Sequence, residues 1–222
     1  MVWKKYPDGN VTQWFQENRD LYYNWSVQGS PHLLPLQGHN GIDIVMPYGT
    51  PIYAVSDQKV VEVRNKEDGY GKHVKCLDST HEWVYGHMSS ISVVIGQSLA
   101  EGDLIGLEGN SGFVVSGSTP YWEHNPFAGA HLHIGARKFT PRQGSGSYNI
   151  QYQSGDRGTI ENYDNGFRGA VDPFPLFHIE LLTVELLIGT DELKRLRAFR
   201  LTLQSIWGFI KMLLTKLFGI LK

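Results

Sequence analysis

The feature that most constrains the fold is a series of short segments rich in β-branched and aromatic residues, with turn residues between them. Residues 51–65 (PIYAVSDQKVVEVRN) and 72–88 (KHVKCLDSTHEWVYGHM) are two such segments. Their side chains favour pleated strands, and the 25 glycines of the chain favour tight turns between strands. Residues 69–71 and 78–80 have the composition of hairpin connections. The sequence therefore predicts mainly β-structure up to about residue 175.

Two later regions depart from this pattern. Residues 144–169 are rich in glycine, serine and asparagine with weak periodicity, which predicts a long surface loop. After Asp172-Pro173, apolar residues recur at helical spacing in the last part of the chain. We therefore expect two domains, a β-rich domain over residues 1–175 and a C-terminal helical tail over residues 176–222.

The charge of the chain is unevenly distributed. The formal net charge is −2, which argues against a nucleic-acid-binding role for the whole chain. From Asp191 onward, seven basic residues accompany only two acidic ones, so the tail is basic and the rest is acidic. Residues 191–221 form a basic amphipathic segment. We expect it to cover an apolar patch on the body or another subunit, or to lie on an anionic membrane surface.

Cysteine usage and targeting signals give little support to other classes. Cys76 is the single cysteine, so an intrachain disulfide is excluded, and a buried hydrophobic role is expected. The N-terminus has no apolar stretch after Lys4 and Lys5, so we expect no secretory signal peptide. Lys211 and Lys216 interrupt the apolar run of the tail, which disfavours a membrane span.

Two short histidine motifs carry the chemistry. His39 and Asp43 are four residues apart, and His131 and His133 are two apart, so each pair points to one face of a strand. Two imidazoles and a carboxylate, with a fourth position for water, are typical of a catalytic zinc site. A further histidine, His87, stands near the end of a predicted strand. The spare histidines are available for acid–base work beside the metal.

The motifs together resemble a known family. GHNGIDIVMPYGTPIYAV, YGHM, GQSLAEGDLIGLEGNSG and GAHLHI occur in the order and spacing of the lysostaphin-like zinc endopeptidases of bacterial cell walls. The resemblance covers roughly residues 10–140. It implies a twisted antiparallel β-sheet that forms a groove with zinc on its floor, to which we add the C-terminal helices.

The resemblance also implies a role for each of five residues. His39, Asp43 and His133 match the zinc ligands, and His87 and His131 match the catalytic histidines. Which of the two histidines acts as the general base stays open, because titrating neighbours share their behaviour. One departure from the family is residues 113–130, which lengthen the path from the glycine turn to His131. This insertion is expected to border the cleft.

The expected function is therefore zinc-dependent hydrolysis of the peptide part of bacterial peptidoglycan, either stem peptide or cross-bridge. The alternatives are a non-catalytic peptidoglycan-binding or activator module, or a phage tail or assembly component on the same scaffold. A carrier domain of the lipoyl type is disfavoured, because no lysine stands on a matching hairpin. The expected site of action is the cell wall. Phage delivery or holin release would bring the protein there without a signal peptide; alternatively, the sequence is a truncated part of a longer chain.

Overall fold

The computed structural model describes residues 9–29, 34–116, 119–120, 125, 127–142, 144 and 148–178. The predicted C-terminal helices lie outside the described residues, apart from the short 3-10 helix η2, Phe174–His178. The domain division at residue 175 and the partner of residues 191–221 therefore stay predictions. Within the described residues, no helix is long and apolar enough to span a membrane.

A large antiparallel sheet forms the centre of the described part. Its strands follow the order β1-β2-β12-β6-β5-β4-β8. In chain order, their bounds are β1 Asn10–Gln13, β2 Ile42–Val45, β4 Gln58–Arg64, β5 His73–Leu77, β6 His81–Gly86, β8 Ser98–Leu99 and β12 Leu132–Thr140. Three more strands extend it from the far part of β12, namely β13 Tyr148–Gln151, β14 Arg157–Ile160 and β15 Ala170–Val171.

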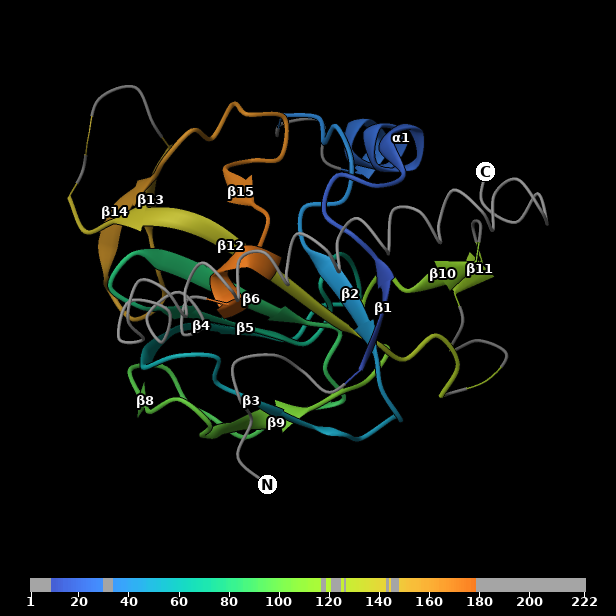
Figure 1. Ribbon diagram of the computed structural model, residues 1–222, viewed down its shortest axis with the longest axis horizontal. Helices are drawn as coiled ribbons and strands as arrows, with labels where there is room; N and C mark the ends of the chain where they lie inside the picture. Colours follow the sequence, from blue (N-terminus) through green and yellow to red (C-terminus); the bar gives the residue numbers. More distant parts are fainter. Residues whose placement is uncertain are drawn as a thin grey trace, which may run out of the picture. The chain divides into compact units, whose positions relative to one another are not determined.

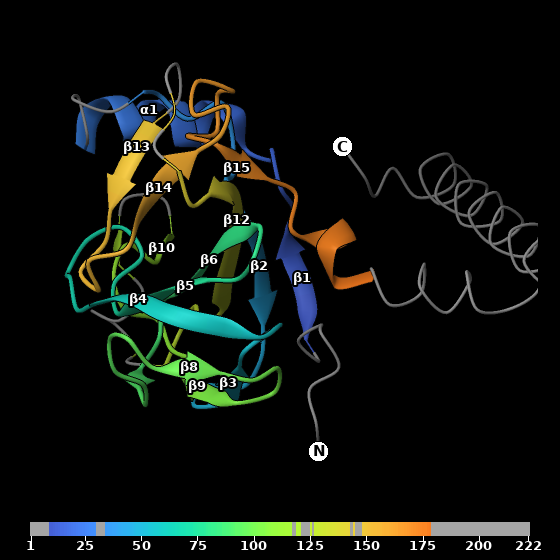
Figure 2. The same ribbon diagram turned by 90° about the vertical axis from the view of Figure 1, so that its left-hand side faces the viewer.

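Smaller elements flank this sheet on opposite sides (Figures 1 and 2). The helix α1, Arg19–Gly29, lies at one end of the domain, and a three-stranded sheet lies at the other. That sheet contains β3 Pro51–Tyr53, β7 Ser90–Ile91 and β9 Leu104–Leu107. A two-stranded hairpin, β10 Val115–Ser116 and β11 Thr119–Pro120, belongs to the inserted segment.

The core lies between the large sheet and the three-stranded sheet. Apolar residues that alternate along the strands supply it, as the period of two in a strand requires. Ile42 and Ile44 of β2 and Leu132 and Ile134 of β12 are fully buried and face this core. Removing so much branched aliphatic surface from water stabilises the sheet by about 1.5–3 kcal/mol for each fully buried side chain. β2 and β12 are therefore held firmly in the sheet.

The predicted class of fold is confirmed, with one correction. β5 and β6 form an antiparallel pair joined through residues 78–80, as the turn composition predicts. The prediction of a loop over residues 144–169 is wrong, because β13 and β14 form a hairpin there. Ile150 and Ile160 give it an apolar side that packs on Val61 and Phe139. The two strands contain few apolar residues among many polar ones, so their strand pattern is hard to recognise in the sequence.

Candidate active site

The register of three adjacent strands brings the histidine motifs together. Asp43 of β2 pairs directly with His133 of β12, and His133 pairs on its other side with Gly86 of β6. His87 follows Gly86, and His131 precedes the first residue of β12. Residues separated by up to 94 positions in the sequence thus meet at one end of the sheet. The site depends on strand pairing that no local motif encodes.

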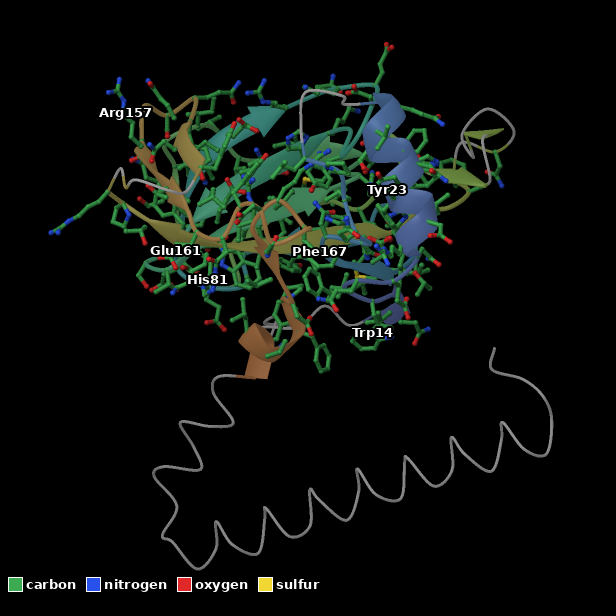
Figure 3. The ribbon with its side chains drawn as sticks, turned by 90° about the horizontal axis from the view of Figure 1, so that it is seen from above. Trp14, Tyr23, His81, Arg157, Glu161 and Phe167 are labelled. Atoms are coloured by element: carbon green, nitrogen blue, oxygen red, sulfur yellow. The ribbon has the colours of Figure 1, made fainter. Side chains whose placement is uncertain are left out.

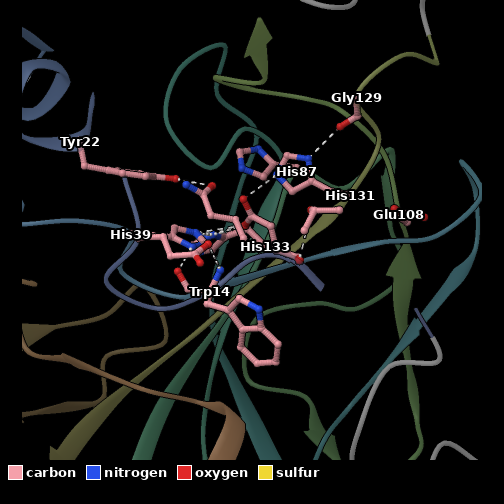
Figure 4. A network of polar contacts seen from close by, with 12 residues as sticks. Trp14, Tyr22, His39, His87, Glu108, Gly129, His131 and His133 are labelled. Atoms are coloured by element: carbon pink, nitrogen blue, oxygen red, sulfur yellow. Dashed lines mark hydrogen bonds and ion pairs between the residues drawn. The ribbon is translucent and has the colours of Figure 1, made fainter. Parts of the chain in front are cut away.

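Three buried side chains point their ligand atoms at one another (Figure 4). His39 Nε2 lies 3.0 Å from His133 Nδ1, His133 Nδ1 lies 3.0 Å from Asp43 Oδ1, and His39 Nε2 lies 3.1 Å from Asp43 Oδ1. Zinc bonds of about 2.0–2.1 Å at tetrahedral angles need ligand atoms about 3.3 Å apart. The edges of the triangle are close to this value, so the three side chains would fit a small metal ion.

The surroundings of the triangle fix the orientation of both imidazoles. His39 Nδ1 lies 3.2 Å from the carbonyl oxygen of Trp14, which directs the lone pair of Nε2 toward the triangle. The ring of Tyr22, from α1, stacks on His39 with centroids 5.2 Å apart. A Cβ atom on Gly41 would lie 2.7 Å from His133 Nε2. Glycine at position 41 is therefore required for His133 to occupy its place.

The triangle also has the charge state that a cation requires. Burial would raise the pKa of Asp43, but the neighbouring His39 and His131 imidazoles hold it well below its usual value. Burial lowers the pKa of His133, which favours its neutral form. A charged carboxylate beside a neutral imidazole belongs to the donor set that binds a divalent transition metal. Asp43 and His133 therefore suit a metal in protonation as well as in distance.

His87 and His131 form a second, separate pair at the edge of the triangle. Their ring centroids lie 4.6 Å apart. His87 Nδ1 lies 2.8 Å from the carbonyl oxygen of Ser111, and His131 Nδ1 lies 2.8 Å from that of Gly129 (Figure 4). Because a carbonyl accepts, each Nδ1 carries the proton and each Nε2 carries a lone pair. Both imidazoles are thus prepared to accept a proton through Nε2.

The backbone at His87 is strained and firmly braced. His87 adopts φ +60°, a left-handed conformation that costs free energy for a residue other than glycine. Its amide donates to Tyr70 O at 2.8 Å, and the amide of Met88 donates to Lys72 O at 3.0 Å. Burial lowers the pKa of His87 well below its usual value, and the neighbouring His131 and His133 lower it further. The neutral base form is therefore favoured.

The five predicted residues are thus brought together, although their roles stay predictions. His131 Nε2 lies 3.6 Å from Asp43 Oδ2, so the pair and the triangle form one site. Sequence reasoning gave His73 and His81 no site role. His73 contacts Glu62 and Tyr70, and His81 lies near Asp78. The inserted residues Tyr121, Trp122 and His124 lie outside the described residues, as does His32.

Several supporting residues were missed by sequence reasoning. Tyr22 stacks on His39, and Ser111 holds His87. Tyr70 packs on the His133 ring with centroids 4.9 Å apart, and its hydroxyl accepts a hydrogen bond of 2.6 Å from Asn40 Nδ2. The position of Asn40 beside His39 is a signal that could have identified it. The others act through loop contacts that leave no sequence pattern.

The site opens onto a groove that extends across the same face of the sheet. The aromatic residues of its lining include Tyr22 and Trp25 of α1, and Phe113, Phe127 and Tyr48. Trp25 contacts Phe113 with centroids 4.6 Å apart, and Tyr48 contacts Phe127 at 4.9 Å. The two phenylalanines belong to the inserted segment, so the described part of this segment borders the cleft as expected. A groove of this kind can hold an extended chain beside the ligand triangle.

Comparisons with known proteins identify several relatives of this chain. Glycyl-glycine endopeptidase ALE-1 of Staphylococcus capitis is 34% identical over 87 residues, which cover 37% of this chain and 24% of that protein. Peptidoglycan DD-endopeptidase ShyA of Vibrio cholerae is 42% identical over 77 residues, covering 35% and 18%. The chain thus spans a quarter or less of the length of these relatives.

Similar solved structures include the catalytic domain of lysostaphin from Staphylococcus simulans. It has 23% identity and a TM-score of 0.43, with 65% of this chain and 86% of that chain covered. The model of peptidase family M23 matches residues 37–147, which is half of the chain and contains all five histidine and aspartate positions of the site. The chain therefore belongs to peptidase family M23, the family of the lysostaphin-like peptidoglycan endopeptidases.

Proposed function

We propose that this protein is a zinc-dependent endopeptidase that hydrolyses peptide bonds of bacterial peptidoglycan. The observation that carries the proposal is that two groups of side chains lie together in one site. One group is a buried triangle of ligand atoms with edges of 3.0–3.1 Å. The other is a pair of histidines whose Nδ1 atoms are both held by backbone carbonyls. Membership of family M23 and the names of the relatives support peptide hydrolysis in the cell wall.

His39, Asp43 and His133 are the proposed zinc ligands. His39 would bind through Nε2, His133 through Nδ1 and Asp43 through Oδ1, because these are the atoms of the triangle. A zinc ion in such a site lowers the pKa of water to about 7 and polarises a carbonyl group as a Lewis acid. Among the described residues the group has three protein ligands, which suits a catalytic role better than a structural one.

His87 and His131 are the proposed acid–base residues. Each presents Nε2 with a lone pair, so each can accept the proton released when water attacks the peptide carbonyl. Once protonated, either imidazole can donate through the same Nε2, to the oxyanion that develops or to the leaving amine. The rings lie 4.6 Å apart, so the two roles are assigned to the pair.

The alternative is a non-catalytic peptidoglycan-binding or activator module, or an assembly component of a phage tail. A binding module has no need for a strained, braced histidine such as His87. The complete ligand triangle also argues against a module that has lost catalysis. An assembly role is compatible with the proposed activity.

The remaining proposals concern location and the tail. An enzyme with this substrate acts on the cell wall, outside the cytoplasm. We place the catalytic domain within residues 1–175 and assign residues 176–222 to a separate helical tail. We propose that residues 191–221 contact a membrane surface or another copy of the chain, because the segment is basic and amphipathic.

Digestion of purified peptidoglycan tests the proposal. Zinc-loaded protein should release new amino termini from peptidoglycan, and a chelator should stop the release until zinc is restored. Mass spectrometry of the fragments identifies the bond. Peptidoglycan of several chemotypes should be used, because the stem peptide and the cross-bridge are both candidate substrates. If no new amino termini appear in any chemotype while zinc is bound, the binding-module alternative replaces the proposal.

A further inference from the structure

A guanidinium group lines the groove beyond the metal site. Arg168 is half-buried and precedes β15, and it adopts φ +55°, a left-handed conformation. Its Nε donates to the carbonyl oxygen of Leu34 at 2.7 Å, which fixes the direction of the side chain. Its Nη2 is buried and has no hydrogen-bond partner in the described part of the chain. A buried charged donor without a partner is costly, so a ligand whose binding moves Nη2 into contact with an acceptor is favoured.

The groove that Arg168 lines has more cationic than acidic side chains along its length. Apart from the metal ligand Asp43, the acidic side chains of its lining are Glu62 and Asp68. The cationic side chains of the lining are Arg64, Lys66, Lys75 and Arg168. Glu62 is already neutralised, with Lys75 Nζ at 3.0 Å and Arg64 Nη2 at 2.9 Å. A groove of this sign in a chain of net charge −2 favours an anionic ligand.

The Arg168 region is continuous with the metal site through two residues. Tyr70 packs on the His133 ring, and its hydroxyl accepts the hydrogen bond of Asn40. Asn40, Tyr70 and Arg168 all line the groove that contains Asp43 and His133. A ligand held by Arg168 would extend from the metal along the groove.

We propose that Arg168 is a specificity-determining residue that binds a free carboxylate of the substrate in the groove that contains the ligand triangle. A guanidinium matches a carboxylate because its planar nitrogens can donate two parallel hydrogen bonds. Stem peptides carry free carboxylates beside their amide cross-links, whereas a glycine cross-bridge carries no charged side chain. The inference rests on the proposed function and selects the stem peptide as the substrate class.

Three matched substrates test this inference. They are a cross-linked stem-peptide dimer with free carboxyl groups, the same dimer with these groups converted to carboxamides, and a glycine-bridged dimer. The wild-type protein should have the highest kcat/KM for the free-acid dimer. Arg168→Gln should lower kcat/KM for this dimer roughly ten- to hundredfold, the effect of losing a charge-assisted hydrogen bond. The same variant should change cleavage of the carboxamide dimer less than about threefold.

Two further variants sharpen the result. Arg168→Lys keeps the charge without the planar nitrogens, so its kcat/KM should lie between those of the wild type and Arg168→Gln. Arg157→Gln is the control, because Arg157 projects outward at the end of β14 away from α1 (Figure 3), and it should leave all three rates unchanged. Zinc content and Tm should be measured for each variant, to separate loss of recognition from loss of fold.

The outcomes distinguish this inference from the proposed function. If the zinc-loaded wild type cuts none of the three substrates, the proposed function fails. If it cuts the free-acid and carboxamide dimers equally well, or prefers the glycine bridge, the function stands and the role of Arg168 is overturned. Because this comparison uses the wild type alone, it remains decisive even if Arg168→Gln does not fold.

Discussion

The proposed metal ligands and the proposed acid–base pair are held by different parts of the fold. Asp43 and His133 stand opposite each other on β2 and β12, inside the sheet, where hydrogen bonds and buried neighbours fix both strands. His87 and His131 lie just beyond the ends of β6 and β12. Their imidazoles are held by carbonyl groups of the segments around Ser111 and Gly129.

This difference has a functional consequence. Changes in the loops should alter proton transfer without removing the metal, whereas changes in the ligand set should remove both. Loops also tolerate insertion better than strands, because their backbone is less constrained by pairing. The inserted residues 113–130 follow Ser111 and end just before His131. An insertion can therefore reshape the cleft while the ligand triangle stays intact.

The largest expected effect comes from His39→Ala. Without one imidazole the triangle keeps two donors, so zinc should dissociate and the rate should fall by more than about 10³-fold. Elemental analysis after dialysis, together with a peptidase assay, measures both. The control is His81→Ala, a half-buried histidine at the first position of β6, at the other end of this strand from His87, and it should keep its zinc and its rate. Retention of zinc by the His39 variant would refute its assignment as a ligand.

A smaller effect is expected from His87→Asn. Asparagine tolerates the left-handed backbone at this position, so the fold should survive. The zinc content should stay unchanged, and kcat should fall by about 10²–10⁴-fold through loss of an acid–base group. Kinetics and elemental analysis on the same preparation give the two readings. A variant with the wild-type rate would show that His131 alone is sufficient.

Ser111→Ala should have a still smaller effect on the rate. The Ser111 hydroxyl donates to Met88 O at 2.7 Å and accepts from Lys72 N at 2.9 Å, so it positions the carbonyl group that holds His87. Losing these bonds should lower kcat by about 3–30-fold and leave zinc bound. Ser154→Ala, in the distant β13–β14 turn, is the matched control. Equal losses in both variants would point to general destabilisation.

Glu108→Gln should change the pH dependence of stability rather than the rate. Burial raises the pKa of Glu108 to about 8, against the opposing hydrogen bond from Met46 N. The folded state therefore favours the neutral acid. Between its unfolded pKa of about 4.3 and about 8, the wild type should lose stability as the pH rises.

The glutamine variant removes this titration. Its Tm should therefore increase relative to the wild type from pH 5 to pH 8, by about 2–4 °C for each kcal/mol. Thermal unfolding at several pH values measures the difference. A constant difference in Tm across this range would mean that Glu108 does not titrate as the structure indicates.

Deletion of residues 190–222 should have the smallest effect on catalysis. No residue of the ligand triangle or of the histidine pair lies there, so the shortened protein should bind zinc and cut soluble peptides at the full rate. Vesicle binding and oligomeric state, compared with the full chain, measure what the tail contributes. If the domain unfolds on deletion, the tail belongs to its core, and both partner proposals for it fail.

Much of the fold and of the site composition follows from local sequence patterns. Strand segments such as residues 58–64 and 73–77 are recognisable by their β-branched residues, and the buried Ile42, Ile44, Leu132 and Ile134 by their alternation. The spacing of the His39–Asp43 and His131–His133 motifs predicts their convergence. These features depend on the two-residue period with which side chains alternate along a strand, and this period can be recognised in one segment alone.

The remaining features depend on contacts between distant segments. The β13–β14 hairpin was missed because its strands are mostly polar, and two isoleucines supply much of its apolar side. Ser111 contacts His87 through its backbone carbonyl, so the type of residue at position 111 does not indicate this contact in the sequence. Arg168 lies in a segment predicted to be a featureless loop. Its partnerless Nη2 is recognisable from the three-dimensional structure alone.

X-ray absorption at the zinc edge tests the central claim most directly. The reconstituted protein should bind one zinc per chain, with nitrogen and oxygen neighbours at about 2.0–2.2 Å and the outer scattering of two imidazole rings. His133→Ala should lose this spectrum, whereas His87→Asn should keep it. A sulfur neighbour at about 2.3 Å, which Cys76 would have to supply, or a spectrum unchanged by His133→Ala, would contradict the assignment of His39, Asp43 and His133 as the metal ligands.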